Sequence, residues 1–212
     1  MKTAFIESSQ IQSLSRPLKT EGTLVVMPVI DLDMGKRAAL LAASRAKADG
    51  LLLVVQDSAR MGRVRVHNEV FRRSVSPHYA YLAQDAFTGR DWLALGLAAL
   101  ARREARFLGF NDGKWHGQMA AFGLVQREWA ESQYGGPLFF EGYQRHYADV
   151  ELTLIAREQG CYAYEPAAMV AEVDWHKEAM VVDPDDKRLF RERASDGFSS
   201  RVQTPELRAL FG

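Results

Sequence analysis

Two short apolar runs, separated by one alanine-rich stretch, constrain the fold of this chain more than any other feature. Residues 23–30 read TLVVMPVI and residues 51–55 read LLLVV, and both are aliphatic runs of buried-strand length. Between them, residues 34–48 read MGKRAALLAASRAKA, which is typical of a helix, and Gly50 ends it. A strand, a helix and a strand in close succession predict a parallel pair joined by a crossover helix. The sequence therefore predicts an α/β fold with a mostly parallel central sheet and helices on both faces.

The rest of the chain continues this alternation of apolar runs and helical stretches. Further strands are predicted at residues 79–82, 106–110, 119–125 and 161–166. Helices are predicted at residues 68–74, 92–103, 128–133, 149–158 and 185–193, and the carboxylate of Asp91 is expected to cap the second of these. We therefore divide the chain into an N-terminal extension (residues 1–22), one domain (residues 23–178) and a C-terminal tail with a short helix (residues 179–212).

Charge and cysteine content argue against several classes of protein. The 27 Lys and Arg balance the 27 Asp and Glu, and no dense basic block is present, so nucleic acid is not expected as a partner. The arginines between residues 60 and 73 alternate with other residue types; a solvated face is the main interpretation and phosphate contact is the alternative. Cys161 is the only cysteine, the first residues lack a secretory pattern, and no apolar run is long enough to span a bilayer. We expect a cytoplasmic protein with no transmembrane segment.

Three of the predicted strands end in an acidic residue. Asp31 follows the first strand, Asp57 the second and Asp85 the third. In open α/β sheets ligands bind beyond the carboxyl ends of the strands, so we predict that these carboxylates share one edge of the sheet. There they would serve a hydroxyl-rich ligand or a cation. The alternative is that aspartate occurs at these positions because it favours turns.

Several common sites are missing from the sequence. No Gly-x-Gly-x-x-Gly follows the first strand, and no Gly-Lys-Ser/Thr loop, His-Glu-x-x-His pair or Gly-x-Ser-x-Gly elbow occurs. The histidines are dispersed and Cys161 has no companion thiol, so a structural zinc site is not expected. A nucleotidyltransferase is disfavoured because the glycine-rich loop with Arg or Lys expected after its first strand is missing. The acids at the strand ends therefore remain the main candidate site.

Five segments occur in the order and spacing of a known enzyme family. They are QDS (residues 56–58), VHNEVFRRS (66–74), LAQDAFTGRDWL (82–93), QYGGPLFFEGYQRHYADVELTLIAREQGCYAYEP (133–166) and VDWHK (173–177). Together they resemble the family-two inverting glycosyltransferases of the GT-A fold, over roughly residues 23–178. The third segment is similar to the family's L-N-N-D-x-x-x-x-P-D-W-L, with Asp85 at the final acid of its metal-binding motif. The fourth is similar to its G-G-F-D … E-D-x-D-L-x-x-R block, with Asp149 at the second acid.

This resemblance implies a Rossmann-like GT-A fold and a metal-assisted, inverting transfer of a glycosyl group from a nucleotide-sugar to an acceptor hydroxyl. It implies Asp149 as general base, Asp85 and His176 as ligands of a divalent cation (Mn²⁺ or Mg²⁺), and donor binding by Asp31, Asp57, Asn68 and Gln84. Such chemistry needs a cation to neutralise the leaving diphosphate and a carboxylate to take the acceptor's proton. The acceptor, whether a glycan, a lipid-linked molecule or a protein, is not specified. Because the chain is short, we expect a partner or a homo-oligomer to supply the acceptor side.

The sequence departs from the family pattern at three positions. Ala83 stands at the first acid of the D-x-D motif, Ala148 at the glutamate before the base, and Ile155 at a usual arginine, with Arg157 two residues later. These changes favour a rival function, a non-catalytic GT-A module that binds a nucleotide or a protein partner. The retained acids favour an enzyme.

Some of the candidate residues also have an ordinary structural interpretation. The aromatic residues Phe139, Phe140 and Tyr143 either form an acceptor platform, since sugars stack on aromatic rings, or fill the core. Asp149 is alternatively a helix N-cap, and His176 a core or surface histidine.

Overall fold

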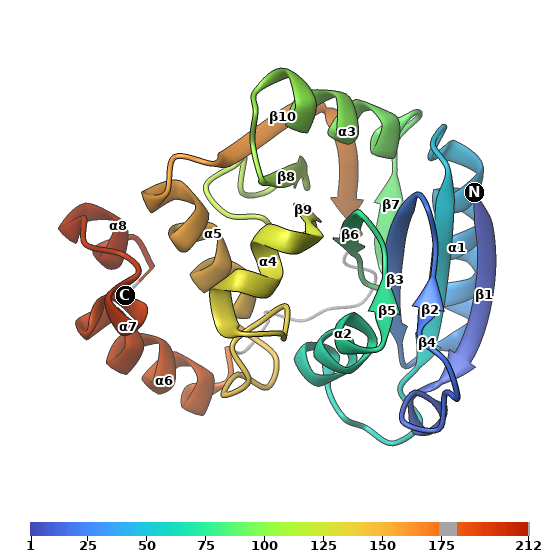
Figure 1. Ribbon diagram of the computed structural model, residues 1–212, viewed down its shortest axis with the longest axis horizontal. Helices are drawn as coiled ribbons and strands as arrows, with labels where there is room; N and C mark the ends of the chain where they lie inside the picture. Colours follow the sequence, from blue (N-terminus) through green and yellow to red (C-terminus); the bar gives the residue numbers. More distant parts are fainter. Residues whose placement is uncertain (174–181, 212) are drawn as a thin grey trace.

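One mixed sheet runs through the molecule (Figure 1), which is described by a computed structural model for residues 1–173 and 182–211. Within these residues, eight strands form the sheet in the order β1-β4-β3-β6-β9-β8-β10-β7. Their bounds are β1 Lys2–Glu7, β3 Thr23–Val29, β4 Gly50–Gln56, β6 His78–Tyr81, β7 Ala86–Thr88, β8 Phe107–Asn111, β9 Gly123–Gln126 and β10 Tyr162–Glu172. A separate short pair is formed by β2 (Leu18–Lys19) and β5 (Ser74–Val75).

Most strands of the sheet share one direction. The strands β1, β4, β3 and β6 are parallel neighbours. The strand β9 is antiparallel to both β6 and β8, so β8 has the direction of β6. The strand β10 is parallel to β8, and only the short β7 beyond it reverses again. This arrangement confirms the predicted α/β class with a mostly parallel central sheet.

Helices cover both faces of the sheet. On one face lie α1 (Leu32–Arg45) and α3 (Trp92–Arg102), and on the other α2 (Arg63–Arg72), α4 (Arg127–Tyr134) and α5 (Ala148–Glu158). Successive residues of β3 serve the two cores in turn: Val25 and Met27 pack with α1 and α3, whereas Leu24 and Val26 pack with α2 and α5. Because both sides of this strand are buried, its sequence is an unbroken apolar run rather than an alternating one.

The helix α1 begins two residues before the helix predicted at 34–48, and α3 begins at Trp92 as predicted. The carboxylate of Asp31 accepts the backbone N–H groups of Asp33 and Met34, each at 3.0 Å, and so caps α1. Asp91 precedes α3, but its backbone is left-handed (φ 58°) and its carboxylate makes no hydrogen bond with the first turn. Instead it pairs with Lys47 Nζ at 3.3 Å. The expectation that its carboxylate caps the helix is therefore wrong.

Both ends of the chain contribute more structure than their sequences predict. Residues 2–7, expected to be part of an extension ahead of the core, form the edge strand β1, which pairs in parallel with residues 51–56 of β4. Among the described C-terminal residues there are three helices, α6 (Pro184–Ser195), α7 (Gly197–Ser200) and α8 (Pro205–Ala209), at the end of the molecule opposite β1 (Figure 1). The strand predicted at 119–125 is shorter than expected. No helix in the described parts of the chain is long and apolar enough to cross a bilayer.

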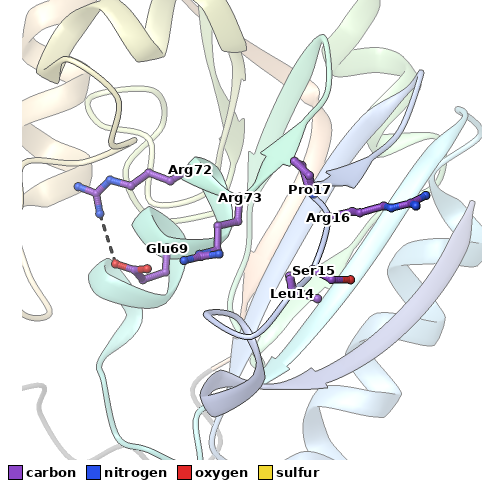
Figure 2. Close-up of a pocket in the computed structure, with 7 residues that line it drawn as sticks. All are labelled: Leu14, Ser15, Arg16, Pro17, Glu69, Arg72 and Arg73. Atoms are coloured by element: carbon purple, nitrogen blue, oxygen red, sulfur yellow. Dashed lines mark hydrogen bonds and ion pairs between the residues drawn. The ribbon is translucent and has the colours of Figure 1, made fainter.

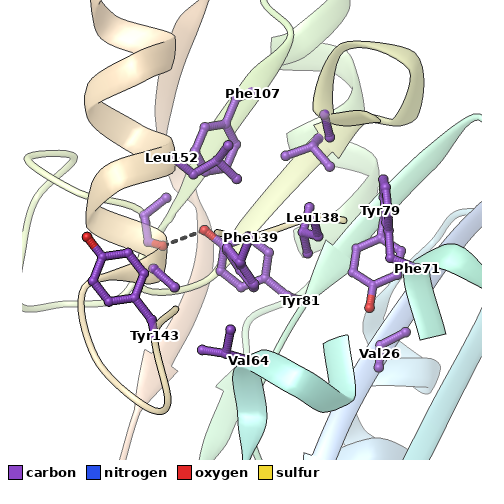
Figure 3. Packing of buried hydrophobic residues seen from close by; sticks show 14 of the residues in the cluster. Val26, Val64, Phe71, Tyr79, Tyr81, Phe107, Leu138, Phe139, Tyr143 and Leu152 are labelled. Carbon is purple, nitrogen blue, oxygen red and sulfur yellow. Dashed lines mark hydrogen bonds between the residues drawn. The ribbon is translucent and has the colours of Figure 1, made fainter. Parts of the chain in front are cut away.

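The core between the sheet and α5 is rich in aromatic rings (Figure 3). The Tyr81 hydroxyl donates to the carbonyl of Ala120 at 2.6 Å, and the Tyr81 and Phe139 rings meet edge to face with centroids 5.2 Å apart. Phe139 and Tyr143 are only 1% and 2% exposed. These two rings fill the core, so of the two interpretations left open by the sequence the core is correct for them and the acceptor platform is not. The part-buried Phe140 ring is covered by the guanidinium of Arg193 at 3.5 Å from its centroid.

His67 lies in the same core as a neutral imidazole. Its Nδ1 is 3.0 Å from the hydroxyl of Tyr79. Burial, together with the nearby positive charge of Arg63, lowers the pKa of His67 from 6.5 to about 3. Because the unfolded chain takes up a proton below pH 6.5 and the native protein does not until about pH 3, this residue destabilises the native state progressively as the pH falls through that window.

We expect His67 to contribute a slope of about 1.4 kcal/mol per pH unit to the free energy of unfolding within this window. The measurement is the unfolding free energy of wild type and His67→Gln at several pH values. The variant loses packing and is less stable at pH 7, but the gap between the two proteins should shrink as the pH falls. Tyr79→Phe keeps the imidazole and should keep the wild-type slope. Parallel pH profiles for wild type and His67→Gln would contradict the assignment.

Candidate active site at the carboxyl edge of the sheet

The three acids predicted to share one edge of the sheet do so. The strands β4, β3 and β6 are adjacent and parallel, and Asp57, Asp31 and Asp85 follow their respective carboxyl ends. A fourth acid, Asp112, follows β8, which runs in the same direction, so it lies at this edge too. Sequence reasoning overlooked Asp112, although it follows an apolar run in the same way as the other three.

Gln84 joins two of the loops at this edge. Its Oε1 accepts the backbone N–H groups of Ile30 and Asp31, at 2.7 Å and 2.9 Å. The segment after β6 is thereby tied to the end of β3, while the Asp31 carboxylate caps α1. Ile30 itself is 78% exposed beside this junction. The two predicted donor-binding residues Asp31 and Gln84 are therefore neighbours.

The other two predicted donor-binding residues are buried and bonded to the chain's own backbone. The two carboxylate oxygens of Asp57 accept the N–H groups of Met61 and Gly62, both at 2.8 Å, and close the loop that leads into α2. The amide of Asn68 donates to the Phe139 carbonyl at 2.9 Å and accepts the Phe139 N–H at 2.8 Å. Both side chains therefore shape the loops around the edge.

Asp149 is buried and, among the described residues, forms an ion pair with a single partner, Arg63. It lies in the first turn of α5, 4% exposed, and its Oδ2 receives the Nη2 of Arg63 at 2.9 Å. The Nε of Arg63 donates to the carbonyl of Arg145 at 2.6 Å. The residue before α5 is Tyr147, in a left-handed conformation, so Asp149 is not the helix N-cap. Sequence reasoning did not select Arg63, because the arginines between residues 60 and 73 look alike in the sequence.

The electrostatic environment of Asp149 extends to the far end of β10. Burial opposes the charge of Arg63, but the attraction and hydrogen bond of Asp149, with smaller contributions from Tyr81 and Glu172, raise the pKa of Arg63 above its usual value. Burial, with Asp149 next in importance, raises the pKa of the Tyr81 hydroxyl well above 10, so it is a neutral donor at neutral pH. Arg63 therefore keeps its positive charge beside Asp149.

Asp85 lies beside the end of β10, the last described strand along the chain. Its backbone carbonyl accepts the N–H of Val173 at 3.0 Å, and the next residue, Ala86, is paired with Glu172 across β7 and β10. Glu172 Oε2 in turn is 3.0 Å from Lys114 Nζ, which comes from the loop after β8. The edge thus carries charges of both signs from β6, β8 and β10.

A protein-only metal centre is not formed by the described residues. Among them, no group of three or more His, Cys, Asp or Glu side chains is placed to hold a metal ion. Asp85 is one predicted ligand at this edge. The other, His176, lies outside the described residues.

Two pockets lie along α2, away from most of these acids. One of about 490 Å³ is lined by Leu14, Ser15, Arg16, Pro17, Glu69, Arg72 and Arg73 (Figure 2), with Arg72 paired to Glu69. None of the predicted site residues lines it. The second, of about 330 Å³, lies between α2 and the loop at residues 141–144, and Asn68 is one of its lining residues.

Comparison with solved structures identifies the fold. Residues 1–349 of S. aureus TarS give a TM-score of 0.64 at 8% identity, covering 90% of this chain and 69% of that one. The same protein in complex with UDP-GlcNAc gives 0.64 at 12% identity, over 90% and 71% of the two chains. The mannosyltransferase PcManGT from Pyrobaculum calidifontis, in complex with GDP-Man and Mn²⁺, gives 0.56 at 12% identity, over 96% and 74%.

These likenesses confirm the predicted GT-A-like glycosyltransferase fold. The chain spans 42% of the longer TarS chain of known structure. No protein-family model matches the sequence, and no curated protein sequence matches it.

Proposed function

We propose that this protein transfers a glycosyl group from a nucleoside diphosphate sugar to an acceptor hydroxyl, with inversion at the sugar carbon. The observation that carries the proposal is the ion pair between the buried Asp149 and the part-exposed Arg63, at the same edge of a GT-A-like sheet as Asp31, Asp57 and Asp85. Structures with this fold are known with UDP-GlcNAc and with GDP-Man, which supports a nucleotide-sugar donor.

In this proposal Asp149 is the general base. As the acceptor oxygen bonds to the sugar carbon, the bond from that carbon to the diphosphate oxygen breaks, and the acceptor's proton passes to the Asp149 carboxylate. Arg63 bonds one oxygen of that carboxylate and so fixes the orientation of the carboxylate before the acceptor binds. Fixed orientation of reacting groups contributes a large part of the rate of such displacements.

The donor side is assigned to the loops that follow β3, β4 and β6. Asp31 and Gln84 form one junction there, and Asp57 and Asn68 hold the loop before α2 and the segment at Phe139. We assign the binding of the nucleotide's base and ribose to Asp31 and Asp57. The acceptor is a glycan, a lipid-linked molecule or a protein, and we assign its binding side to a separate partner or to a second copy of the chain.

A divalent cation, Mn²⁺ or Mg²⁺, fits this site only as a cation shared with the donor. Asp85 supplies one carboxylate at the edge, and His176 is the second ligand in our proposal. Cations of this kind are often held by one or two protein groups together with substrate phosphates, so a sparse protein contribution is compatible with binding. When bound, the cation neutralises negative charge on the leaving diphosphate. The Mn²⁺ in the PcManGT complex supports a divalent cation as part of the proposal.

The rival function is a GT-A module that binds a nucleotide or a protein without turnover. Two residues favour it: Ala83 and Ala148 stand where the related enzymes have acids, and Ala148 is buried at the start of α5. The enzyme and a nucleotide-binding module would both bind the nucleotide, but only the enzyme would turn it over. Binding and turnover must therefore be measured separately.

The first test is a melting-temperature panel of nucleoside diphosphates and nucleotide-sugars, including UDP-GlcNAc and GDP-Man, with and without Mn²⁺. A compound at roughly a hundredfold its dissociation constant should stabilise the protein by about 2.7 kcal/mol, which is about 5–10 °C for a chain of this size. If no nucleotide raises the melting temperature with or without Mn²⁺, the enzyme and the nucleotide-binding module are both ruled out, and only the protein-binding module remains.

We expect Asp85→Asn to abolish most of the additional stabilisation that Mn²⁺ gives to the nucleotide complex. The amide keeps the shape of the carboxylate but removes the negative charge that a hard cation requires. Asp91→Asn is the matched control, because it removes only the surface pair with Lys47. An unchanged Mn²⁺ effect in Asp85→Asn would assign Asp85 a structural role.

A further inference from the structure

The helix α6, the first of the three described helices after β10, holds the loop that leads to Asp149. Asp186, in the first turn of α6, is 1% exposed. Its carboxylate accepts the backbone N–H groups of Gln144, Arg145 and His146, at 2.8, 2.8 and 2.7 Å. Successive amides that converge on one point form an anion-binding concavity, and here a side chain of the same chain fills it.

The same loop connects Asp186 to the proposed base. The Arg145 N–H is bonded to Asp186, and the Arg145 carbonyl accepts Nε of Arg63 at 2.6 Å. Nη2 of the same guanidinium donates to Asp149 at 2.9 Å. A planar guanidinium fixed at two of its nitrogens has a defined orientation. The position of the Arg145 peptide therefore sets the direction from which Arg63 approaches Asp149.

Other contacts fix α6 against this loop and the start of α5. The rings of Tyr147, the residue before α5, and Phe190 of α6 stack with centroids 4.6 Å apart. Asp183 caps α6 through the N–H groups of Asp185 and Asp186, and its own N–H donates to Nδ1 of His146 at 3.3 Å. Asp186 is thus held rigidly on its own helix while it holds the loop.

We propose that Asp186 is a positioning residue for the glycosyl transfer, acting on Asp149 through the Arg145 peptide and Arg63. The inference rests on the proposed function, in which Asp149 is the general base. Without the Asp186 carboxylate, three part-buried amides lose their acceptor and the loop relaxes. Arg63 then loses its defined orientation, and with it Asp149. A displacement of about 1 Å in a reacting group can cost on the order of 100-fold in rate.

The test compares Asp186→Asn with Asp185→Asn. Both replace one aspartate of α6 by its amide, but Asp185 is a surface residue paired with Arg188. The assay is the hydrolysis of UDP-GlcNAc and GDP-Man in the presence of Mn²⁺, with donor affinity measured by titration. We expect Asp186→Asn to lower kcat about 10- to 100-fold while the donor dissociation constant changes less than about threefold. Asp185→Asn should match wild type in both.

A double variant separates positioning from a purely structural role. If Asp186 acts through Asp149, then Asp186→Asn should cost almost nothing further in kcat when Asp149 is already Asn, since coupled residues are not additive. If the kcat losses of the two single variants multiply in the double variant, the inference is overturned. A wild-type kcat in a folded Asp186→Asn protein would overturn it as well. Unchanged turnover in Asp149→Asn alone, or no turnover in wild type, counts against the proposed function and removes the basis of the inference.

Arg63→Lys tests the same route if Asp186→Asn does not fold. Lysine keeps a positive charge for Asp149 but cannot also bond the Arg145 carbonyl with a planar fork. The same selective loss of kcat, with donor affinity retained, supports the route through Arg145. Wild-type kcat in Arg63→Lys overturns it.

Discussion

Asp149→Asn is expected to lower turnover of the bound nucleotide-sugar by about 10²–10⁴-fold, whether the acceptor is a hydroxyl compound or water. The amide cannot take up the proton, but it keeps the shape of the side chain and still offers one oxygen to Arg63. Because Asp149 faces the acceptor and not the diphosphate in this mechanism, donor affinity should remain close to that of wild type. Single-turnover hydrolysis and a donor titration measure the two quantities separately.

The matched control for this variant is Asp33→Asn. Asp33 is also an acid in the first turn of a helix, but it is exposed on α1. The Asp33→Asn variant should turn over the nucleotide-sugar at the wild-type rate. If Asp149→Asn does the same, the base lies elsewhere and the assignment by resemblance fails. Glu151, two residues after Asp149, is not a suitable control, because it is fully buried and bonded.

Glu151→Gln is expected to lower the free energy of unfolding by about 3–5 kcal/mol. Arg193 donates to both carboxylate oxygens of Glu151, at 2.7 and 2.6 Å, and these oxygens also accept the hydroxyls of Tyr134 and Tyr143 at 3.0 and 2.9 Å. Glu151 is 0% exposed. The variant would leave the guanidinium enclosed without its opposite charge. A loss of this size is a large part of the stability of a typical domain.

Denaturant unfolding measures this effect, as a lower midpoint at an unchanged slope. Arg188→Ala is the control from the same helix. Its pairs with Asp185 at 3.0 Å and Glu192 at 3.4 Å lie at the surface, where such pairs contribute about 0–1 kcal/mol. If Glu151→Gln and Arg188→Ala lower the free energy of unfolding equally, the buried pair of Glu151 and Arg193 does not fix α6 to α5. The result is independent of the proposed enzymatic function.

Aromatic residues show why a sequence segment can support two interpretations. The spacing of Phe139, Phe140 and Tyr143 suits an exposed sugar platform and a packed core equally well. The choice depends on what covers them, and α5, α6 and Arg193 are the covering groups. Asp91 is a similar case: the residue is in the predicted place, but a left-handed backbone directs its carboxylate to Lys47.

Local sequence alone determined the class of fold and one edge of the sheet. The runs at 23–30 and 51–55, with the helix between them, predict parallel strands, and parallel strands bring the residues after them to one edge. Asp31, Asp57 and Asp85 were therefore located without any tertiary information. These predictions hold because they depend on periodicity and chain direction, which are properties of short segments.

Only the tertiary structure decided which groups act on Asp149. Arg63 and Asp149 are 86 residues apart, and Asp186 lies about 40 residues from the amides that it binds. Neither pairing leaves a periodic or local pattern, because each depends on α2, α5 and α6 packing around one loop. The edge strand β1 was hidden for a related reason: its role comes from pairing with β4, 49 residues further along the chain. Sequence patterns record the conformation of a segment, whereas contacts between distant segments arise only when the whole chain packs.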